Sequence, residues 1–440
     1  MAKLKPFKGL MYNVDKIEDA SKVISLPYDK ISPEQWQKYV DGSEFNIAQV
    51  ILGKKSSLDT EDDNRYTRAQ KTFDHWIKEN IIKEDDAFKF YIYEQEYCVP
   101  ETDKTLKRTA LMAMVELEEF SKKIILPHEK TLSGPKKDRL ELMRKTGMNF
   151  GQIFGLFKDS KKHVLNILDS YKTSKPYFSI KTSEEGVRHS LWHIDNEKDV
   201  ALIQDFFEDK QIYIADGHHR YTTAINYRDE LAESSSTPNP MSRYRLMSLV
   251  AAEDEGMIVL PTHRLIHSLK NFDPSVFLKK LETYFDIEIF ENNQKDTFLK
   301  KLYEEVSSHR IGFSLHKNEN YHLLQLKDND AVKDVLNDLD TCLSSLDVVV
   351  LHDLILAKIM DISLKDIEEQ ACIKYKRSFE EALALSQEDT FQVAFFLRPT
   401  TVKQVMDVAD KGEYMPQKST DFFPKLYTGI IMSKVSVVNN

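Results

Sequence analysis

The most concentrated set of chemically capable side chains lies where an apolar run meets a polar one. The set consists of Asp216, Gly217, His218, His219 and Arg220. Residues 212–215 before it are apolar and β-prone, and the residues from His218 onward suit a helix. The sequence therefore predicts a strand, a sharp turn at Gly217 and then the N-terminus of a helix.

A turn of this kind favours an anion. The amides of His218 and His219 would stand at a helix N-terminus, where free N–H groups and the helix dipole attract negative charge. Arg220 adds a planar guanidinium that matches phosphate oxygens. Asp216 can cap the helix, hold a metal ion or accept a proton. Asp-Gly is also a common turn, so a purely structural explanation competes, but the two adjacent histidines favour a site.

Two further polar clusters occur in the first half of the chain. Asp29 precedes the helix start "SPEQW" and is either a turn residue or a site carboxylate. His128 and Glu129 follow an apolar strand and are either a metal ligand with a base or exposed loop residues. The sequence leaves both choices open.

The second half of the chain contributes two more clusters. Arg264 follows His263 after an apolar run. Lys418, Ser419 and Thr420 combine a lysine with two hydroxyls, which suits a phosphate or a carboxylate but also suits a solvated loop.

Composition restricts the function. The 440 residues include 61 basic and 71 acidic side chains, and the net charge of −10 argues against a general nucleic-acid binder. The sequence contains no run of about 18 apolar residues and no secretory signal pattern, so we expect a cytoplasmic protein that does not span a membrane. The H-E-x-x-H, G-x-S-x-G, G-x-G-x-x-G and P-loop patterns are also missing from the sequence.

The pattern of apolar residues predicts a mixed α/β (α+β) protein. Residues 45–52 are predicted to form a strand, residues 64–82 an amphipathic helix, and residues 87–99 with 104–117 a hairpin. The loop 231–242 is rich in serine and proline. We therefore expect two regions, 1–236 with the first three clusters and 237–440 with the last two.

The clusters also resemble a known family. The stretches "PYDKIS", "PHEKTLSGPKKDRLELM", "IADGHHRYTTA", "LPTHRL" and "MPQKSTDFFPKL" are similar to those of the DUF1015 family of bacterial proteins. The stretch "IADGHHRYTTA" also resembles the signature of the ParB/sulfiredoxin superfamily, whose acidic-Gly-x-x-Arg turn holds nucleotide phosphates. The missing helix-turn-helix speaks against a ParB clamp, and the missing cysteine in the turn speaks against sulfiredoxin. The resemblance is best to the kinases that phosphorylate free serine, because their turn also uses Asp-Gly-His-His-Arg chemistry.

The resemblance implies a ParB/sulfiredoxin-like nucleotide-binding core with large insertions and a second, C-terminal α/β region. It implies a phosphotransferase of serine metabolism that uses ATP or ADP with Mg²⁺ and acts on a small hydroxylated metabolite, with L-serine the first choice. The expected catalytic carboxylates are Asp29, Glu129 and Asp216. The expected nucleotide-binding residues are Gly217, His218, His219, Arg220, His128, Arg264, Lys418, Ser419 and Thr420.

Two alternatives remain at this stage. One is a metal-dependent hydrolase, in which His128, Glu129, Asp216 and the two histidines of the turn would bind a divalent ion that activates water. The other is a nucleotide-binding switch or scaffold that turns over no metabolite. The sequence does not determine whether the histidines bind metal, what the oligomeric state is, or whether the five clusters meet in one site.

Overall fold

The chain folds into two units that alternate along the sequence. The structure is a computed structural model and describes residues 1–130, 133–234, 240–306, 308–336 and 339–435. Unit 1 comprises Met1–Pro127, Thr131–Met257 and Pro424–Asn440, and unit 2 comprises His128–Lys130 and Ile258–Phe423. The division into regions 1–236 and 237–440 stays a prediction about domains.

Unit 1 is built on a mixed β-sheet. The strands of unit 1 are β1 (Leu4–Lys5), β2 (Leu10–Tyr12), β3 (Ile82–Glu84), β4 (Phe90–Cys98), β5 (Thr105–Glu116), β6 (Ile125–Leu126), β7 (Met148–Asn149), β8 (Ile153–Phe157), β9 (Phe178–Lys181), β10 (Arg188–Ile194), β11 (Ile212–Asp216), β12 (Tyr244–Ala251) and β21 (Ser433–Lys434). The main sheet has the order β6-β11-β8-β12-β5-β4-β10-β9, with β1 also paired to β5. The pairs β11·β6 and β12·β8 are parallel and the other pairs are antiparallel.

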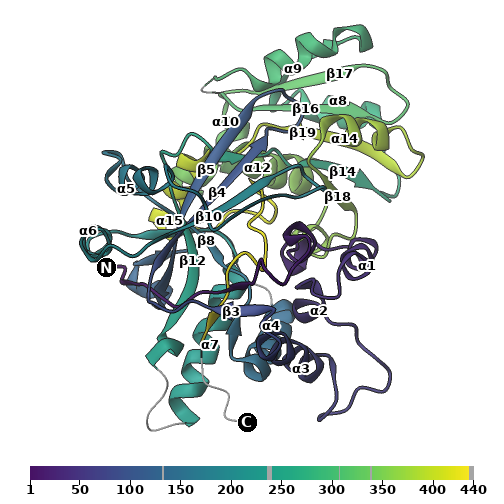
Figure 1. Ribbon diagram of the computed structural model, residues 1–440. Helices are drawn as coiled ribbons and strands as arrows, with labels where there is room; N and C mark the ends of the chain where they lie inside the picture. The colour runs from purple at the N-terminus through teal and green to yellow at the C-terminus, as the bar shows by residue number, and fades with distance from the viewer. Residues whose placement is uncertain (131–132, 235–239, 307, 337–338, 436–440) are drawn as a thin grey trace. The chain divides into compact units, whose positions relative to one another are not determined.

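The helices of unit 1 are η1 (Ala20–Lys22), η2 (Tyr28–Lys30), α1 (Pro33–Gly42), α2 (Ala48–Ile51), α3 (Arg65–Lys78), η3 (Phe120–Lys122), α4 (Ser133–Thr146), α5 (His163–Tyr171), α6 (Glu197–Phe207), α7 (His218–Ser234) and η4 (Pro240–Arg243). Helix α4 packs against both α3 and α7, and α2 packs against α3 (Figure 1). This places the N-terminal half of α7 beside α4, where the site described below is found.

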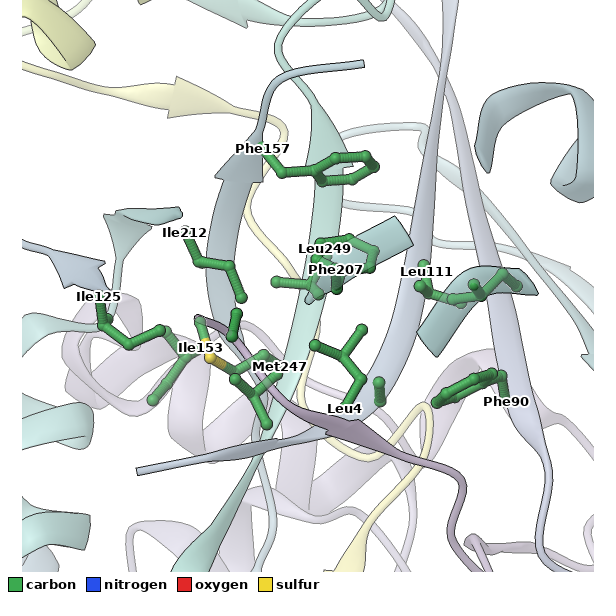
Figure 2. Packing of buried hydrophobic residues seen from close by; sticks show 14 of the residues in the cluster. Leu4, Phe90, Leu111, Ile125, Ile153, Phe157, Phe207, Ile212, Met247 and Leu249 are labelled. Carbon is green, nitrogen blue, oxygen red and sulfur yellow. The ribbon is translucent and has the colours of Figure 1, made fainter. Parts of the chain in front are cut away.

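Alternate residues of the central strands form the core of unit 1. The side chains of β5, β8, β11 and β12 that face one side pack with residues of α5, α6 and α7. Figure 2 shows Ile153, Met247 and Leu249 in this cluster, all with no exposed surface. Because side chains alternate along a strand, the other face of β4 and β5 presents a different set, which includes Gln95 and Arg108.

Unit 2 contains an antiparallel six-stranded sheet. The strands of unit 2 are β13 (Ile258–Val259), β14 (His263–His267), β15 (Phe285–Phe290), β16 (Arg310–Leu315), β17 (Tyr321–Leu326), β18 (Ile373–Lys376), β19 (Phe391–Leu397) and β20 (Phe422–Phe423). The sheet order is β15-β17-β16-β19-β14-β18, and β13 pairs with β20. Residues of α9 (Lys295–Tyr303) and α14 (Phe379–Ser386) pack on one face.

The remaining helices of unit 2 are α8 (Pro274–Leu281), η5 (Asn292–Gln294), α10 (Asp330–Leu336), α11 (Thr341–Ser344), α12 (Asp347–Val349), the π-helix η6 (Val350–Ile359), α13 (Leu364–Glu368) and α15 (Val402–Lys411). Rings of Phe277 on α8, Phe313 and Phe395 contact one another edge-on or at a tilt. The aromatic contacts fix α8 on the sheet.

The predicted strand at residues 45–52 is wrong, because this segment contains the short helix α2. Asn46 is the cause: its side-chain oxygen accepts the Ala48 amide at 2.9 Å, and its side-chain nitrogen donates to the carbonyls of Lys22 and Ile24. Such side-chain bonds stabilise a turn in place of a strand. A short apolar run does not distinguish a buried helix from a buried strand.

The mixed α/β class is confirmed, and so is the strand, turn and helix expected around Gly217. The helix expected at 64–82 is α3, which Asn64 begins with a capping box, and the expected hairpin is β4 with β5. Across the part of the chain that the structure describes, no helix has both the length and the apolar character to cross a bilayer.

The assignment of the core of unit 1 can be tested by its effect on the free energy of unfolding. Leu249 has no exposed surface, and Leu249→Ala should lower the free energy of unfolding by about 2–5 kcal/mol, because it removes buried methyl groups and leaves a cavity. Leu202 on α6 is 48% exposed, so Leu202→Ala should change it by less than about 0.5 kcal/mol. Chemical denaturation of both variants measures this. Equal losses would contradict the assignment of the core.

Candidate phosphate-binding site

The turn after β11 requires glycine. Gly217 has a φ of +98°, a backbone conformation that other residues rarely adopt. A Cβ atom at this position would lie 3.0 Å from both Nε and Nη2 of Arg220. The guanidinium of Arg220 therefore lies directly against the turn, and its Nη1 donates to the Gln152 carbonyl at 2.5 Å. Gly217 and Arg220 therefore pack directly against each other.

Asp216 is surrounded by positive charge. Its Oδ2 lies 3.5 Å from Arg220 Nη2 and 3.9 Å from Lys425 Nζ. Burial would raise the pKa of Asp216, but Lys425, Arg220, Lys30 and His218 together hold that pKa well below its usual value. The carboxylate is thus ionised at neutral pH and is a poor proton acceptor. It holds the cations in place and stays 25% exposed.

Three guanidinium groups meet in one cleft of unit 1. The cleft has a cavity volume of about 50 Å³ and opens to solvent. The cleft is lined by Pro27, Tyr28, Ile51, Arg139, Leu142, Met143, Met148, Phe150, Gly151, Arg220, Thr223, Arg245 and Thr428. The arginines come from α4, α7 and β12, which are separate parts of the sequence.

The three arginines differ in their counter-ions. Arg139 forms an ion pair with Asp138, which Arg65 shares, and Arg220 lies near Asp216. Among the described residues, Arg245 has no carboxylate within ion-pair distance and its buried Nε has no hydrogen-bond partner.

The environment of Arg245 is unfavourable for its charge. Arg245 is 4% exposed, and its Nη2 donates to the Gly151 carbonyl at 2.8 Å. Burial, together with the nearby charge of Arg220, lowers the pKa of Arg245 to about 9. The guanidinium remains protonated at neutral pH, and the cleft therefore carries positive charge that an anionic ligand would neutralise.

Tyr28 and Asp29 form one edge of this region. The guanidinium of Arg139 lies over the Tyr28 ring, 4.1 Å from its centre. Burial raises the pKa of Tyr28, with Asp29 acting in the same direction and Arg139 and Arg220 opposing it. Asp29 itself is exposed and follows Tyr28 in η2. It is the carboxylate of the predicted set that is open to solvent next to the cleft.

The two histidines of the turn have different environments. His218 is 5% exposed, whereas His219 is half-buried. The carbonyls of both accept bonds within α7, from the hydroxyls of Thr222 and Thr223. Consecutive residues of a helix point about 100° apart, so one ligand cannot meet both rings in the same way.

The remaining predicted residues belong to unit 2, where three of them meet. His128 is fully buried, and its Nε2 lies 3.1 Å from Thr420 Oγ1 and 4.0 Å from Glu129 Oε1. The Thr420 hydroxyl donates to Glu129 at 3.4 Å. Imidazole, hydroxyl and carboxylate thus form one polar cluster.

The other unit 2 residues hold a loop. Arg264 is 1% exposed and donates to the carbonyls of Thr262 and Lys418. The Ser419 hydroxyl donates to the Pro416 carbonyl at 2.5 Å. Lys418 has a φ of +59° and an exposed side chain. Arg264 and Ser419 shape this loop, and Lys418 is the member whose charge faces solvent.

Several residues of the site are missing from the sequence prediction. They are Tyr28, Arg139, Arg245, Lys425 and Thr428. Signals existed for most of them, because Tyr28, Arg139 and Lys425 lie within the stretches that carry the family resemblance. Arg245 has the same strand parity as Met247 and Leu249, so an arginine falls on the core face of a buried strand. Burying such a charge lowers the stability of the fold, so its presence indicates a function.

A metal centre made of protein ligands is not evident. Within the described ranges, no three His, Cys, Asp or Glu side chains group closely enough to hold a metal ion. The ionised Asp216 could still supply one oxygen ligand to an ion held mainly by phosphates.

Comparison with known proteins gives one family and several distant structures. The family described as "Protein of unknown function (DUF1015)" matches residues 4–349. No curated protein matches the chain. Similar solved structures include a conserved hypothetical protein from Pyrococcus furiosus, with 12% identity, coverage of 72% of this chain and 92% of that chain, and a TM-score of 0.33.

Two other solved structures have similar values. A free serine kinase in complex with AMP has 11% identity, coverage of 74% and 91%, and a TM-score of 0.33. SbnI with a C-terminal truncation, from Staphylococcus aureus, has 10% identity, coverage of 72% and 85%, and a TM-score of 0.32.

The charge balance at Asp216 predicts a pH dependence of stability. Asp216→Asn leaves Arg220 and Lys425 without their shared carboxylate, and the free energy of unfolding at pH 7 should fall by about 1–3 kcal/mol. The native pKa of Asp216 is below its unfolded value. Its stabilisation is therefore complete above the unfolded pKa and is lost as the pH falls through the native pKa.

The difference between the variant and the wild type should thus shrink on acidification from pH 7 to about pH 3. Asp74→Asn is the control, because burial raises the pKa of Asp74 and no cation among the described residues pairs with it; this variant should lose no stability. Denaturant titrations at several pH values measure both. A loss for Asp216→Asn that is the same at every pH would show that packing, not charge, is responsible.

Proposed function

The chain belongs to the DUF1015 family, and we propose that it binds a nucleoside di- or triphosphate, ADP or ATP, and transfers a phosphoryl group to a small hydroxylated metabolite. The observation that carries this proposal is the convergence of Arg139, Arg220 and Arg245 on one cleft, with Arg245 lacking a counter-ion among the described residues. A phosphate dianion is the ligand that best neutralises such a group of guanidiniums.

The charges near the cleft support a ligand with more than one negative charge. Three carboxylates, Asp29, Asp138 and Asp216, face a larger number of cations. The cations of this region are Arg65, Arg139, Arg220, Arg245, Lys30 and Lys425. A diphosphate or triphosphate would balance this excess, because each phosphate can accept from two guanidinium N–H groups at once.

The apolar wall of the cleft supports an organic ligand. Leu142, Met143 and Phe150 line it together with the arginines, and ligand sites commonly combine an apolar lining with a few polar groups in this way. A free phosphate ion would leave most of this wall uncovered. A nucleoside attached to the phosphates would cover it.

Phosphoryl transfer requires a group that takes the proton of the acceptor hydroxyl. Asp29 is the proposed acceptor of this proton in unit 1, because it is exposed beside Tyr28, whereas the low pKa of Asp216 makes that carboxylate unsuitable. Asp216 is better suited to hold the Mg²⁺ ion that accompanies a nucleotide, which would neutralise charge on the phosphates. L-serine is the first acceptor to test.

Substitution of Arg245 tests the proposed nucleotide binding most directly. Arg245→Met should weaken ADP binding about 10- to 100-fold, since a charge-assisted bond contributes about 1.5–3 kcal/mol. Arg243→Met is the matched control, because Arg243 is 66% exposed, pairs with Glu116 and does not line the cleft. Calorimetric titration measures both affinities. Equal affinities for wild type and Arg245→Met would refute the proposed phosphate site.

Asp29 tests the chemistry separately from binding. Asp29→Asn should lower the rate of phosphoserine formation from ADP or ATP with Mg²⁺ about 100- to 10,000-fold, while ADP affinity stays within about twofold. Asp103→Asn, at an exposed carboxylate of the β4–β5 loop, should change neither quantity. Phosphorus NMR of the products detects transfer. ADP binding without any phosphorylated small product, across a panel of hydroxylated metabolites, would favour a nucleotide-binding switch.

A further inference from the structure

Two buried polar residues lie on the face of the unit 1 sheet that does not carry the apolar core cluster. Gln95 on β4 and Arg108 on β5 are cross-strand partners, and each is 1% exposed. Arg108 Nη2 donates to Gln95 Oε1 at 2.5 Å, and the guanidinium lies over the Phe154 ring, 4.6 Å from its centre. Burial lowers the pKa of Arg108 to about 10, with Tyr97, Tyr93 and Asp254 opposing the shift.

These residues hold the backbone of a distant segment. Arg108 donates to the Pro424 carbonyl, and Gln95 Nε2 donates to the Lys425 carbonyl at 2.9 Å. Gln152 Nε2 donates to the Tyr427 carbonyl at 3.0 Å. Residues 424–427 belong to no strand, so side chains replace the backbone ladder that would otherwise hold such a segment.

The segment 424–428 brings two side chains to the phosphate site. The Lys425 ammonium lies 3.9 Å from Asp216, and Thr428 lines the arginine cleft. Thr428 is fixed by a pair of backbone bonds with Ser25, at 2.8 and 3.1 Å. Gln152 connects the two parts directly, since its carbonyl accepts from Arg220 and its side chain binds the Tyr427 carbonyl.

We propose that Arg108 is a positioning residue of the phosphate site, which acts through Gln95 and the carbonyls of Pro424 and Lys425 to hold the Lys425 ammonium beside Asp216. This inference rests on the proposed function, because it assumes that the site binds phosphates. Arg108 is not among the residues that line the cleft, so the proposal assigns its effect on ligand binding to the segment.

The geometry explains why an arginine stands at this buried position. The Arg108 Nη2 donates to both the Gln95 side chain and the Pro424 carbonyl, and the planar guanidinium fixes the directions of these two N–H bonds. A lysine has the charge but not the fork. An apolar residue would leave Gln95 Oε1 and the Pro424 carbonyl without this donor, at a cost in stability but with no direct effect on an anion.

Two variants test the inference with inorganic pyrophosphate as the probe. Gln95→Glu retains the acceptor for Arg108 but removes the donor to the Lys425 carbonyl, and Arg108→Lys retains the charge but loses the fork. Each should weaken pyrophosphate binding about tenfold. In a Lys425→Met background the same changes should alter affinity less than about twofold, because the group through which they act is gone.

Amide hydrogen exchange provides a readout that does not depend on any ligand. Exchange at residues 425–428 should be faster in both variants, while exchange in β5 and β12 stays unchanged. Trp192→Phe is the control, because it removes a partly buried hydrogen bond to the Ser174 carbonyl elsewhere in unit 1 and should affect neither the segment nor binding.

The outcomes separate the two proposals. Failure of the wild type to bind pyrophosphate would refute the proposed function. Wild-type binding that both variants preserve would overturn the positioning role, whether or not exchange in the segment changes. A tenfold loss that persists in the Lys425→Met background would also overturn it, since Arg108 would then act on stability or charge in general. Gln95→Glu keeps nearly the same shape as the wild type, so it remains informative if Arg108→Lys folds poorly.

Discussion

A buried guanidinium without a carboxylate partner is the constraint on which the site of unit 1 depends. The Arg245 charge is disfavoured by burial and by the neighbouring Arg220. The Gly151 carbonyl accepts a hydrogen bond from Nη2, but the buried Nε has no partner among the described residues. A folded chain that retains such a charge gives up stability, because an apolar residue would pack there at lower cost. An anion in the cleft would reverse this cost. The free energy that burial of this charge costs would thus be recovered on binding, and this is the physical basis of the proposed phosphate site.

The rest of the site is arranged around the same charge excess. The positive φ of Gly217 lets the Arg220 side chain lie against the turn. The Asp216 carboxylate lies near both Arg220 and Lys425, so one negative charge faces two positive charges. Lys425 comes from a segment more than 200 positions away in the sequence, and buried side chains of β4 and β5 hold that segment. Preorganised donors of this kind need not rearrange when a ligand arrives, which is what electrostatic catalysis of phosphoryl transfer requires.

The sequence predicted the parts of this site that depend on neighbouring residues. The strand, the glycine turn and the helix around Asp216 are local, so residue types and periodicity were sufficient. Arg139, Lys425 and Thr428 come from distant segments, and no local pattern connects them. The helix α2 was missed because the Asn46 side chain, and not the apolar pattern, determines its conformation. Arg245 could have been found, because its parity on β12 places a charge among core residues.

A crystal structure of the full-length protein with bound ADP would test the central claim most directly. We expect phosphate oxygens within hydrogen-bond distance of the Arg220 and Arg245 guanidiniums, and we expect the Arg245 Nε, which has no partner in the described structure, to donate to one of them. The adenosine should lie along the wall formed by Leu142, Met143 and Phe150. Phosphates bound elsewhere, with the arginine cleft still empty, would contradict the account.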